Sequence, residues 1–138
     1  MDKKKDISDK LRSSGLRPTK QRVRLAEYLF NRSKTFHFSV ENLDKVINKK
    51  GSEEKIALAT IYNTVNAFKK AGHLKEILLK EGRSYFDTNT TAHHHFYDSD
   101  TNELIDIRFN EIVVTKLPQP PKGKQIRDLE VIIGLKKI

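Results

Sequence analysis

The chain has 138 residues and a formal net charge of +9, with 33% charged and 36% apolar residues. This length and balance allow one sizeable core or two small ones. No apolar run approaches the roughly 18 residues of a membrane span, and the charged N-terminus does not look like a signal peptide, so we expect a cytoplasmic protein with no membrane partner. The absence of cysteine excludes disulfides, cysteine zinc sites and thiol catalysis.

The positive charge is concentrated in one part of the chain. Residues 1–86 contain 20 Lys and Arg against 10 Asp and Glu, whereas residues 87–138 contain 7 against 8. A basic segment suits a polyanion such as nucleic acid. The alternative, a lysine-rich composition without functional meaning, stays open on the charge alone.

Three helices are predicted in the basic part. The first follows a capping residue at Thr19 and runs to about Asn31, the second runs from a cap at Ser39 to Gly51, and the third ends at Gly72. Each has apolar residues at helical spacing. These are Val23, Ala26, Leu29 and Phe30, then Val40, Leu43, Val46 and Ile47, then Ile61, Val65 and Phe68.

Strands are predicted after the helices. Residues 74–79 and 84–86, joined by a turn at 80–83, give a hairpin signal. Three helices and a hairpin follow the order of a winged helix-turn-helix, so we expect an α+β protein whose DNA-binding domain covers residues 1–87. Residues 88–138 form the second domain, a small α/β dimerisation and metal-sensing domain.

The second domain is predicted to contain two short strands and a third, half-buried one. The short strands lie at 93–97 and 103–107, a proline-rich break follows at 118–123, and apolar residues alternate from Leu129 to Leu135. So few strands leave open edges, and two copies would cover them, so we expect a homodimer. A monomer with this sheet packed on the helices is the alternative.

The outer face of the third predicted helix is typical of a DNA-reading helix. Tyr62, Asn63 and Asn66 face outward when the apolar residues face inward, and Thr60 and Thr64 flank them. Such side chains bind base edges or thymine methyls in the major groove. An ordinary amphipathic helix explains this segment equally well. Four basic residues near the first helix suit phosphate contacts, or the minor groove in the case of the first: Arg17, Lys20, Arg22 and Arg24.

Three of the five histidines form one run, His93-His94-His95. On a strand His93 and His95 face one side and His94 the other. Imidazole and carboxylate together suit zinc, iron(II) or manganese. A metal held by both domains would fix the angle between them and act as a switch. The candidate ligands are His37, Asp87, His93, His95 and Asp106.

Other interpretations of the histidines are weighed against this one. His94 is a candidate for a second metal or for haem, and the run could be a chance surface cluster. His73 is expected to be an exposed histidine at a helix end rather than a ligand. No HExxH pattern appears, so a metalloenzyme is not expected. A nucleic-acid-binding module that works without metal, with structural histidines, remains the main alternative.

Four motifs carry a resemblance to a known family. They are Gly15-Leu16-Arg17-Pro18-Thr19-Lys20-Gln21-Arg22, Ala59-Thr60-Ile61-Tyr62-Asn63-Thr64, Ala71-Gly72 and Tyr85-Phe86-Asp87. Their order and spacing resemble the ferric uptake regulator family of bacterial transcription factors. The closer likeness is to its iron response regulator branch, where three segments and the short ending after Gly123 look typical: Tyr85–Asn89, His93–Tyr97 and Glu103–Ile107.

The resemblance implies a dimeric, metal- or haem-responsive regulator of iron and haem genes, mostly a repressor, which binds double-stranded promoter DNA and is not an enzyme. The five candidate ligands fall on the family's regulatory metal site, Tyr62 on a base-contacting position and Arg17 on a minor-groove position. In this branch the histidine run is linked to haem, and a haem-delivering enzyme would be a further partner of unknown identity.

The sequence departs from the family in three ways. It has no cysteine pairs for a structural zinc and no N-terminal Cys-Pro haem motif. The additional metal site that many relatives have near the C-terminus is not evident, and Glu111 is a weak candidate for it. The C-terminal sheet must therefore be held by packing alone, and any haem would need histidine ligands.

Overall fold

The computed structural model describes residues 3–51, 54–79 and 82–138. The chain divides into two compact units, Met1–Thr90 and Thr91–Ile138. This division falls three residues after the domain boundary expected from the sequence. Within the described ranges, no helix has the length and apolar character needed to cross a membrane.

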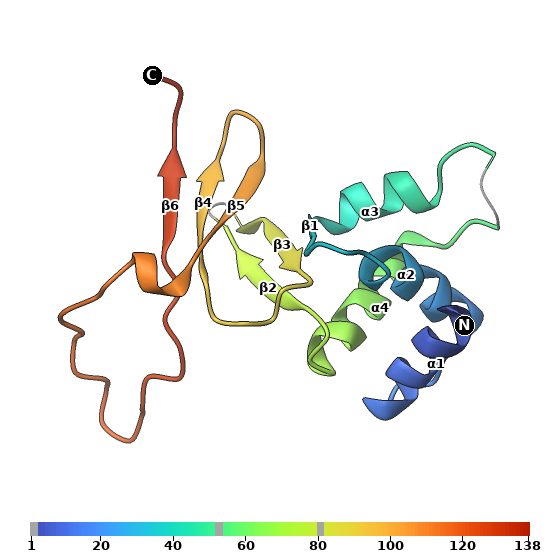
Figure 1. Cartoon of the computed structure of the whole chain (residues 1–138), viewed down its shortest axis with the longest axis horizontal. Coiled ribbons are helices and arrows are strands. Elements are labelled where there is room, and N and C mark those ends of the chain that lie inside the picture. Colours follow the sequence, from blue (N-terminus) through green and yellow to red (C-terminus); the bar gives the residue numbers. More distant parts are fainter. Residues whose placement is uncertain (1–2, 52–53, 80–81) are drawn as a thin grey trace. The chain divides into compact units, whose positions relative to one another are not determined.

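The described part of the N-terminal unit contains four helices (Figure 1), and side chains cap two of them. Thr19 Oγ1 accepts a hydrogen bond from the Arg22 amide at 3.3 Å, and Ser39 Oγ accepts one from the Asn42 amide at 3.1 Å. Both bonds satisfy amides that would lack a partner at a helix start, which confirms the two predicted caps. The helices are α1 (Lys3–Ser13), α2 (Lys20–Phe30), α3 (Val40–Ile47) and α4 (Leu58–Lys70).

Helix α1 was not predicted. It has only two large apolar residues, Ile7 and Leu11, and charged residues fill most of its other positions. Two apolar residues are too few for a helical period to be recognised in the sequence. Because they stand four residues apart, they share one face, and both are buried in the core of the unit.

The core of the N-terminal unit lies between the helices. The predicted inner residues of α4, Ile61, Val65 and Phe68, are at most 1% exposed, which confirms them. Leu25 of α2 is fully buried although the periodicity did not select it, and Val46 of α3, predicted to face inward, is 40% exposed. Val46 lies near the end of an eight-residue helix, and the turn there needs only Leu43 and Ile47 to cover the core.

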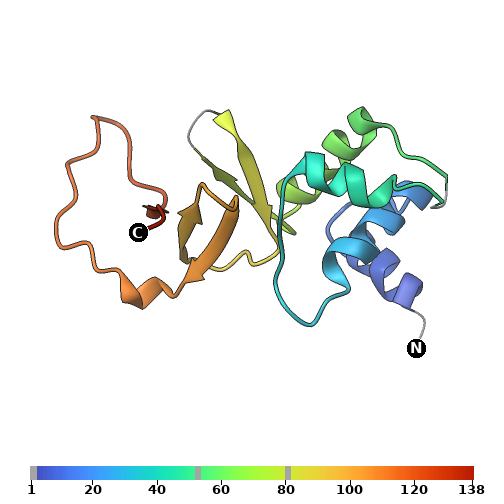
Figure 2. The same ribbon diagram turned by 90° about the horizontal axis from the view of Figure 1, so that it is seen from above.

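A three-stranded antiparallel sheet completes this unit. Strands β2 (Lys75–Leu78) and β3 (Ser84–Asp87) form the predicted hairpin, and Lys80 and Glu81 of its predicted turn lie outside the described residues. A two-residue strand that was not predicted, β1 (His37–Phe38), pairs with the other edge of β3, so that the order is β1-β3-β2. Figure 2 shows this sheet beside the helices. This is the winged-helix architecture expected from the sequence.

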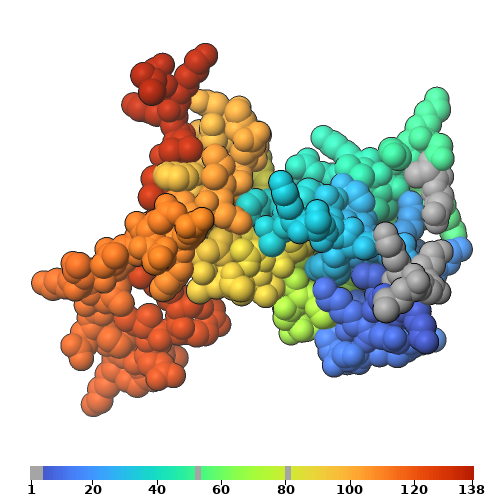
Figure 3. All heavy atoms as spheres, viewed as in Figure 1, coloured from blue at the N-terminus to red at the C-terminus, as the bar shows by residue number. Residues whose placement is uncertain are grey.

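A second three-stranded sheet forms the centre of the C-terminal unit. Strands β4 (His94–Asp98) and β5 (Glu103–Ile107) are antiparallel, and β6 (Ile132–Leu135) runs parallel to β4 on its other side. Between β5 and β6 the chain forms one short 3-10 helix, Phe109–Glu111, and then runs without helix or strand to residue 131. Figure 3 shows this irregular stretch as orange to red chain.

The C-terminal unit leaves much apolar surface uncovered. Of the alternating residues predicted to face inward, Val131 and Leu135 are half-buried, whereas Leu129 and Ile133 are 40% and 38% exposed. The prediction was wrong for these two because a single small sheet has no second layer within this unit to cover both of its faces. Exposed apolar side chains of this number suit a surface that is covered by a partner. The exposed apolar residues of this unit include Ile105, Phe109, Val113, Val114, Leu117, Ile126 and Leu129.

The fully buried position of Leu25 predicts a large effect of its truncation. Leu25→Ala should lower the free energy of unfolding by about 2–5 kcal/mol, because it removes buried methyl groups and leaves a cavity. Val46→Ala, at the exposed position of α3, should lower it far less. Urea unfolding followed by circular dichroism measures both, and equal losses would contradict this description of the core.

Candidate metal centre and nucleic-acid interface

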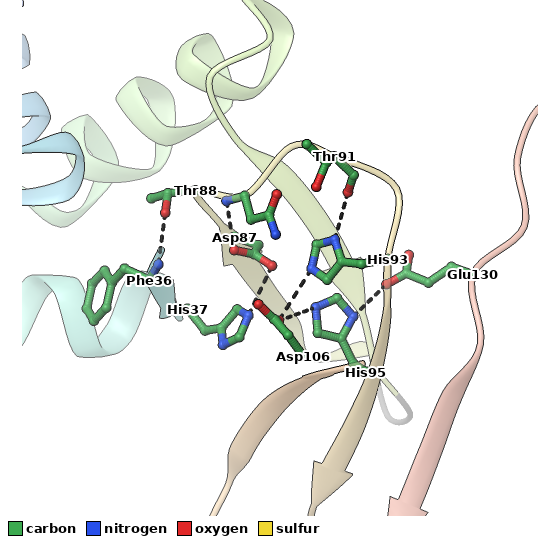
Figure 4. Close-up of polar contacts among 10 residues, drawn as sticks. Phe36, His37, Asp87, Thr88, Thr91, His93, His95, Asp106 and Glu130 are labelled. Atoms are coloured by element: carbon green, nitrogen blue, oxygen red, sulfur yellow. Dashed lines mark hydrogen bonds and ion pairs between the residues drawn. The ribbon is translucent and has the colours of Figure 1, made fainter. Parts of the chain in front are cut away.

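Two histidines and a carboxylate of the C-terminal unit point at one another (Figure 4). The pairing of β4 with β5 places His95 opposite Asp106, and His93 lies just before β4. The Nε2 atoms of His93 and His95 lie 3.3 and 3.2 Å from Asp106 Oδ1, and the ring centroids are 4.4 Å apart. Both imidazoles are buried, while 36% of the Asp106 side chain is exposed.

The other ring nitrogens of these histidines also have partners. His93 Nδ1 lies 2.7 Å from the carbonyl oxygen of Thr91, and His95 Nδ1 lies 3.1 Å from Glu130 Oε1. A carbonyl oxygen can only accept, so Nδ1 of His93 donates to Thr91. When Nδ1 of His95 donates to Glu130 in the same way, the Nε2 lone pairs of both neutral rings face Asp106.

This arrangement fits a divalent cation. Two nitrogen lone pairs and a carboxylate oxygen would repel one another at these distances unless a cation or an extra proton lay between them. Two imidazole nitrogens and carboxylate oxygen form a ligand set that suits zinc, iron(II) and manganese. Hydrogen bonds on the outer nitrogens also orient the rings as in known metal sites.

A second histidine–carboxylate pair lies in the N-terminal unit. The register of β1 and β3 places His37 opposite Asp87, and their Nε2 and Oδ2 atoms are 3.0 Å apart. Asp87 is fully buried, and its Oδ1 accepts a hydrogen bond from the Asn89 amide at 2.8 Å. Burying a carboxylate costs free energy unless such partners compensate it. This pair therefore offers one imidazole nitrogen and one carboxylate oxygen, which is part of the ligand set of a metal site.

The chain leaves the N-terminal sheet through a tied-down segment. The Phe36 amide donates to Thr88 Oγ1 at 2.8 Å, and the Thr88 amide donates to the Phe36 carbonyl at 3.1 Å. These two bonds hold the residues that flank His37 and Asp87 side by side. The position of this pair is thus set by main-chain contacts as well as by strand pairing.

His94 lies on the other side of β4, as strand alternation predicts. It is 1% exposed, its ring stacks on Phe109 with centroids 5.2 Å apart, and its Nδ1 accepts from the Val131 amide at 2.9 Å. His73 was expected to be exposed, but it is half-buried, packed against Phe30 and Phe68, with Nε2 2.7 Å from Ser14 Oγ. Burial and the nearby Lys10 ammonium lower the pKa of His73.

Among the described residues, two partners of His93 and His95 were not predicted from the sequence. Thr91 acts through its carbonyl, which any residue would supply, so no sequence signal exists for it. Glu130 lies 35 residues after His95 and reaches it because the chain before β6 lies alongside β4. An acidic residue within the alternation from Leu129 to Leu135 gives a faint signal that could have found it.

Helix α4 presents the predicted DNA-reading side chains in part. Tyr62, Asn63 and Asn66 are exposed and Thr60 is half-buried. Thr64, predicted to flank them, lines the same recess as Thr60 and Asn63, but it is only 4% exposed. It is more covered than expected because it lies next to Val65 and one turn from Ile61, on the edge of the buried stripe.

A recess beside α4 collects several of the predicted contacts. Arg17 and Arg22 line it from the N-terminal end of α2, and Thr60 and Asn63 line it from α4. The Arg22 guanidinium donates to the Arg17 carbonyl at 3.2 Å, which holds the two arginines together. Lys20 is exposed and lines a separate shallow recess with Lys55. Cationic and hydrogen-bonding groups therefore meet on one face of the N-terminal unit.

Arg24 has a structural contact rather than the predicted availability for phosphate. Its guanidinium donates to the Ile47 carbonyl at 2.7 Å and also to the Glu54 carbonyl. These carbonyls lie at and after the end of α3, where helix carbonyls lack partners. Arg24 thus joins α2 to the chain that follows α3.

Tyr62 is held by an acidic neighbour from α3. Its hydroxyl donates to Glu41 Oε1 at 2.6 Å. This hydrogen bond lowers the pKa of Glu41, because it stabilises the carboxylate. It raises the pKa of Tyr62, because the phenolate would lose the bond and face a negative charge. The contact fixes the orientation of the exposed tyrosine.

A winged-helix unit together with groups of histidine and aspartate ligands is typical of DNA-binding regulators that respond to metal ions. A model of the ferric uptake regulator family matches residues 13–133, and the chain belongs to this family. Its members are metal-binding transcription regulators rather than enzymes.

Two curated relatives and one solved structure illustrate the likeness. The chain is 32% identical over 106 residues to the ferric uptake regulation protein of Pseudomonas fluorescens, covering 76% of this chain and 84% of that one. It is 28% identical over 105 residues to the peroxide operon regulator of Bacillus subtilis, covering 76% and 70%. The ferric uptake regulator of Pseudomonas aeruginosa with manganese matches with a TM-score of 0.67 and 26% identity, over 94% of this chain and 96% of that one.

The Tyr62–Glu41 hydrogen bond predicts a change in the pKa of Tyr62. Glu41→Gln should lower that pKa toward the ordinary tyrosine value, because the carboxylate no longer favours the protonated phenol. NMR titration of the Tyr62 ring carbon measures it. Glu103→Gln removes the same charge in the other unit and should leave the Tyr62 pKa unchanged; equal shifts in both variants would refute the specific contact.

Proposed function

We propose that this protein is a cytoplasmic, dimeric transcriptional regulator, mostly a repressor, whose affinity for promoter DNA depends on a bound divalent metal. The observation that carries the proposal is the convergence of His93 Nε2, His95 Nε2 and Asp106 Oδ1 in the C-terminal unit. Membership of the family supports both the binding of DNA and the binding of a metal.

We propose that the two histidine–carboxylate groups share one ion of iron(II), manganese or zinc. Only five residues, 88–92, separate Asp87 from His93 in the sequence. Each unit supplies an incomplete set, a pair in one and three ligands in the other, and typical sites for these metals need four or more ligands. The ion would supply the positive charge that the ligands lack. The proposed ligands are His37, Asp87, His93, His95 and Asp106.

Such an ion would make the angle between the units depend on metal. Without it, the ligands of the two units would not have to meet, and residues 88–92 would be the covalent connection between the units. With it, ligands from both units must meet at one point, which favours one arrangement over the others. A dimer in that arrangement would present both α4 helices at the spacing of two half-sites, about one turn of DNA apart.

Haem is the second candidate ligand, at His94. The structure gives less support for it, because His94 is 1% exposed, stacks on Phe109 and uses Nδ1 to accept from a main-chain amide. Only Nε2 could then bind iron, and the ring would have to become accessible. We therefore propose the divalent metal as the signal and keep haem as a separate arm of the test.

We place the target genes in iron and haem metabolism, following the resemblance to the iron response regulator branch. The three-histidine run supports this branch. Relatives named for ferric uptake and for peroxide response make a peroxide signal the competing assignment. Adding peroxide to the iron(II)-loaded protein before DNA binding would separate these two signals.

The dimer is proposed on the exposed apolar residues of the C-terminal unit. Ile105 of β5 and Ile132 and Ile133 of β6 remain exposed on both outer strands of the sheet. A second copy would cover such surface and the open strand edges. The mass in solution, with and without metal, tests this part.

Loss of one metal ligand should abolish the metal response. For His93→Ala and Asp106→Asn we expect the metal-dependent gain in operator affinity to disappear, since the first removes a ligand nitrogen and the second removes the negative charge of the carboxylate ligand. The measurement compares apo, metal-loaded and haem-loaded protein on an operator selected from random DNA, at fixed salt. His73→Asn, outside the group, is the control and should respond as the wild type does. Equal operator affinity of wild type with and without metal would instead favour a metal-independent nucleic-acid-binding module.

The recess beside α4 predicts two distinguishable effects on DNA binding. Arg17→Ala should weaken binding to all sequences and reduce the slope of log affinity against log salt by about 1, because one phosphate contact is lost. Asn63→Ala should instead cost about 1–3 kcal/mol on the selected operator alone, because it removes a base contact. Lys136→Ala in the other unit is the charge control. Unchanged binding in both test variants would refute this interface.

A further inference from the structure

The Glu130 carboxylate contacts His95, which is a proposed metal ligand, but Glu130 is not itself one of the proposed ligands. Its Oε1 lies 3.1 Å from Nδ1 of His95, and the Nε2 atom of the same ring lies 3.2 Å from Asp106. His95 is fully buried and 22% of the Glu130 side chain is exposed. The imidazole is thus held between two carboxylates, one on each nitrogen.

A neutral imidazole has one proton for these two carboxylates. If the proton is on Nδ1, it is donated to Glu130 and the Nε2 lone pair is available for a metal. If the proton is on Nε2, it is donated to Asp106, and the Nε2 atom of His95 and the Asp106 oxygen that accepts the proton are both lost as metal ligands. Glu130 therefore competes with Asp106 for the proton, and only the first outcome leaves a metal site. His93 needs no such residue, because the Thr91 carbonyl accepts from its Nδ1.

Glu130 reaches His95 through the pairing of the C-terminal segment with β4. The His95 amide donates to the Val131 carbonyl at 3.1 Å, and the Val131 amide donates to His94 Nδ1 at 2.9 Å. From there β6 continues alongside β4, with Ile132 opposite His95. The same short segment that supplies the carboxylate therefore also begins strand β6.

We propose that Glu130 is a positioning residue that holds the proton of His95 on Nδ1, and that metal binding in turn stabilises the docking of residues 130–135 on β4. This inference rests on the proposed metal site and extends it to the C-terminal strand. A metal on Nε2 makes the Nδ1 proton a stronger donor, so the bond to Glu130 strengthens on loading. Through linkage, a docked strand then binds metal more tightly than a released one.

The test uses two variants of the 138-residue chain. Glu130→Ala removes the acceptor, whereas Glu130→Gln keeps a neutral oxygen acceptor of similar reach. We expect zinc affinity, measured by chelator competition, to fall by about 10–100-fold in the alanine variant and by less in the glutamine variant. Asp128→Ala is the control, because it removes the same charge two residues away from an exposed side chain paired with Arg127.

Two further readouts separate positioning from folding or charge. Nitrogen-15 NMR of the metal-free protein, recorded at a pH at which the His95 ring is neutral, reports which nitrogen of His95 carries the proton. It should move from Nδ1 to Nε2 in the alanine variant, and stay on Nδ1 in the glutamine and control variants. Amide hydrogen exchange of residues 131–135 should slow on adding zinc to the wild type and change less in the alanine variant.

The outcomes are decisive for each idea separately. Wild-type tautomer and wild-type zinc affinity in Glu130→Ala would overturn the role of Glu130 while leaving the metal site intact. Equal losses of affinity in all three variants would reduce its effect to net charge and also overturn it. A wild-type protein that binds no zinc, iron(II) or manganese would overturn the proposed function, and the metal-free NMR result would still decide whether Glu130 orients His95.

Discussion

The close approach of two imidazole nitrogens to one carboxylate oxygen is the constraint on which the C-terminal unit depends. The Nε2 atoms of the buried His93 and His95 lie within 3.3 Å of Oδ1 of Asp106, whose side chain is 36% exposed. Lone pairs on all three atoms would repel one another, so a positive charge between them would stabilise the arrangement. A metal ion held by the three side chains would provide that charge.

The N-terminal unit solves a similar problem differently. Asp87 is fully buried, yet it accepts from the Asn89 amide and lies against His37. The main-chain donor keeps this carboxylate tolerable without an ion, so the pair can persist in a stable winged-helix unit. The helical core around Leu25, Ile61 and Phe68 does not depend on it. The stability of the helical core that carries α4 is thus separate from that of the proposed metal ligands, although a few residues of chain join the two units.

The elements whose side-chain pattern is strong could be predicted from the sequence. The capping residues Thr19 and Ser39 predicted the starts of two helices, and the spacing of Ile61, Val65 and Phe68 predicted α4. Both predictions succeeded because capping and periodic burial are local properties. Helix α1 and strand β1 could not be found, since two apolar residues, or two paired residues, give no period. The alternation before Leu135 correctly indicated a strand but not its exposure, which depends on what covers the sheet.

For the candidate site, local chemistry gave the ligand types and strand alternation gave the faces. The spacing of two residues was enough to place His93 and His95 together and His94 apart. Glu130 and the Thr91 carbonyl were beyond such reasoning. The first depends on a parallel pairing that brings residues 35 positions apart into contact, and the second on main chain that has no sequence signature. Contacts of this kind orient the ligands, and prediction from sequence misses them because they depend on how distant parts of the chain pair.

The lack of cysteine gives the Glu130 contact a wider meaning. Many relatives are expected to hold the corresponding sheet with a cysteine-bound zinc, and this chain cannot. Its strand β6 is short, exposed and preceded by about twenty residues without helix or strand. Ordering such a segment costs conformational entropy, and few apolar contacts within the unit offset it. A hydrogen bond from His95 to Glu130 that strengthens when metal binds would supply part of this stability only in the loaded state. The C-terminal strand would then be ordered by the regulatory ion itself, and the surface that β6 offers to a second copy would depend on the same signal as DNA binding.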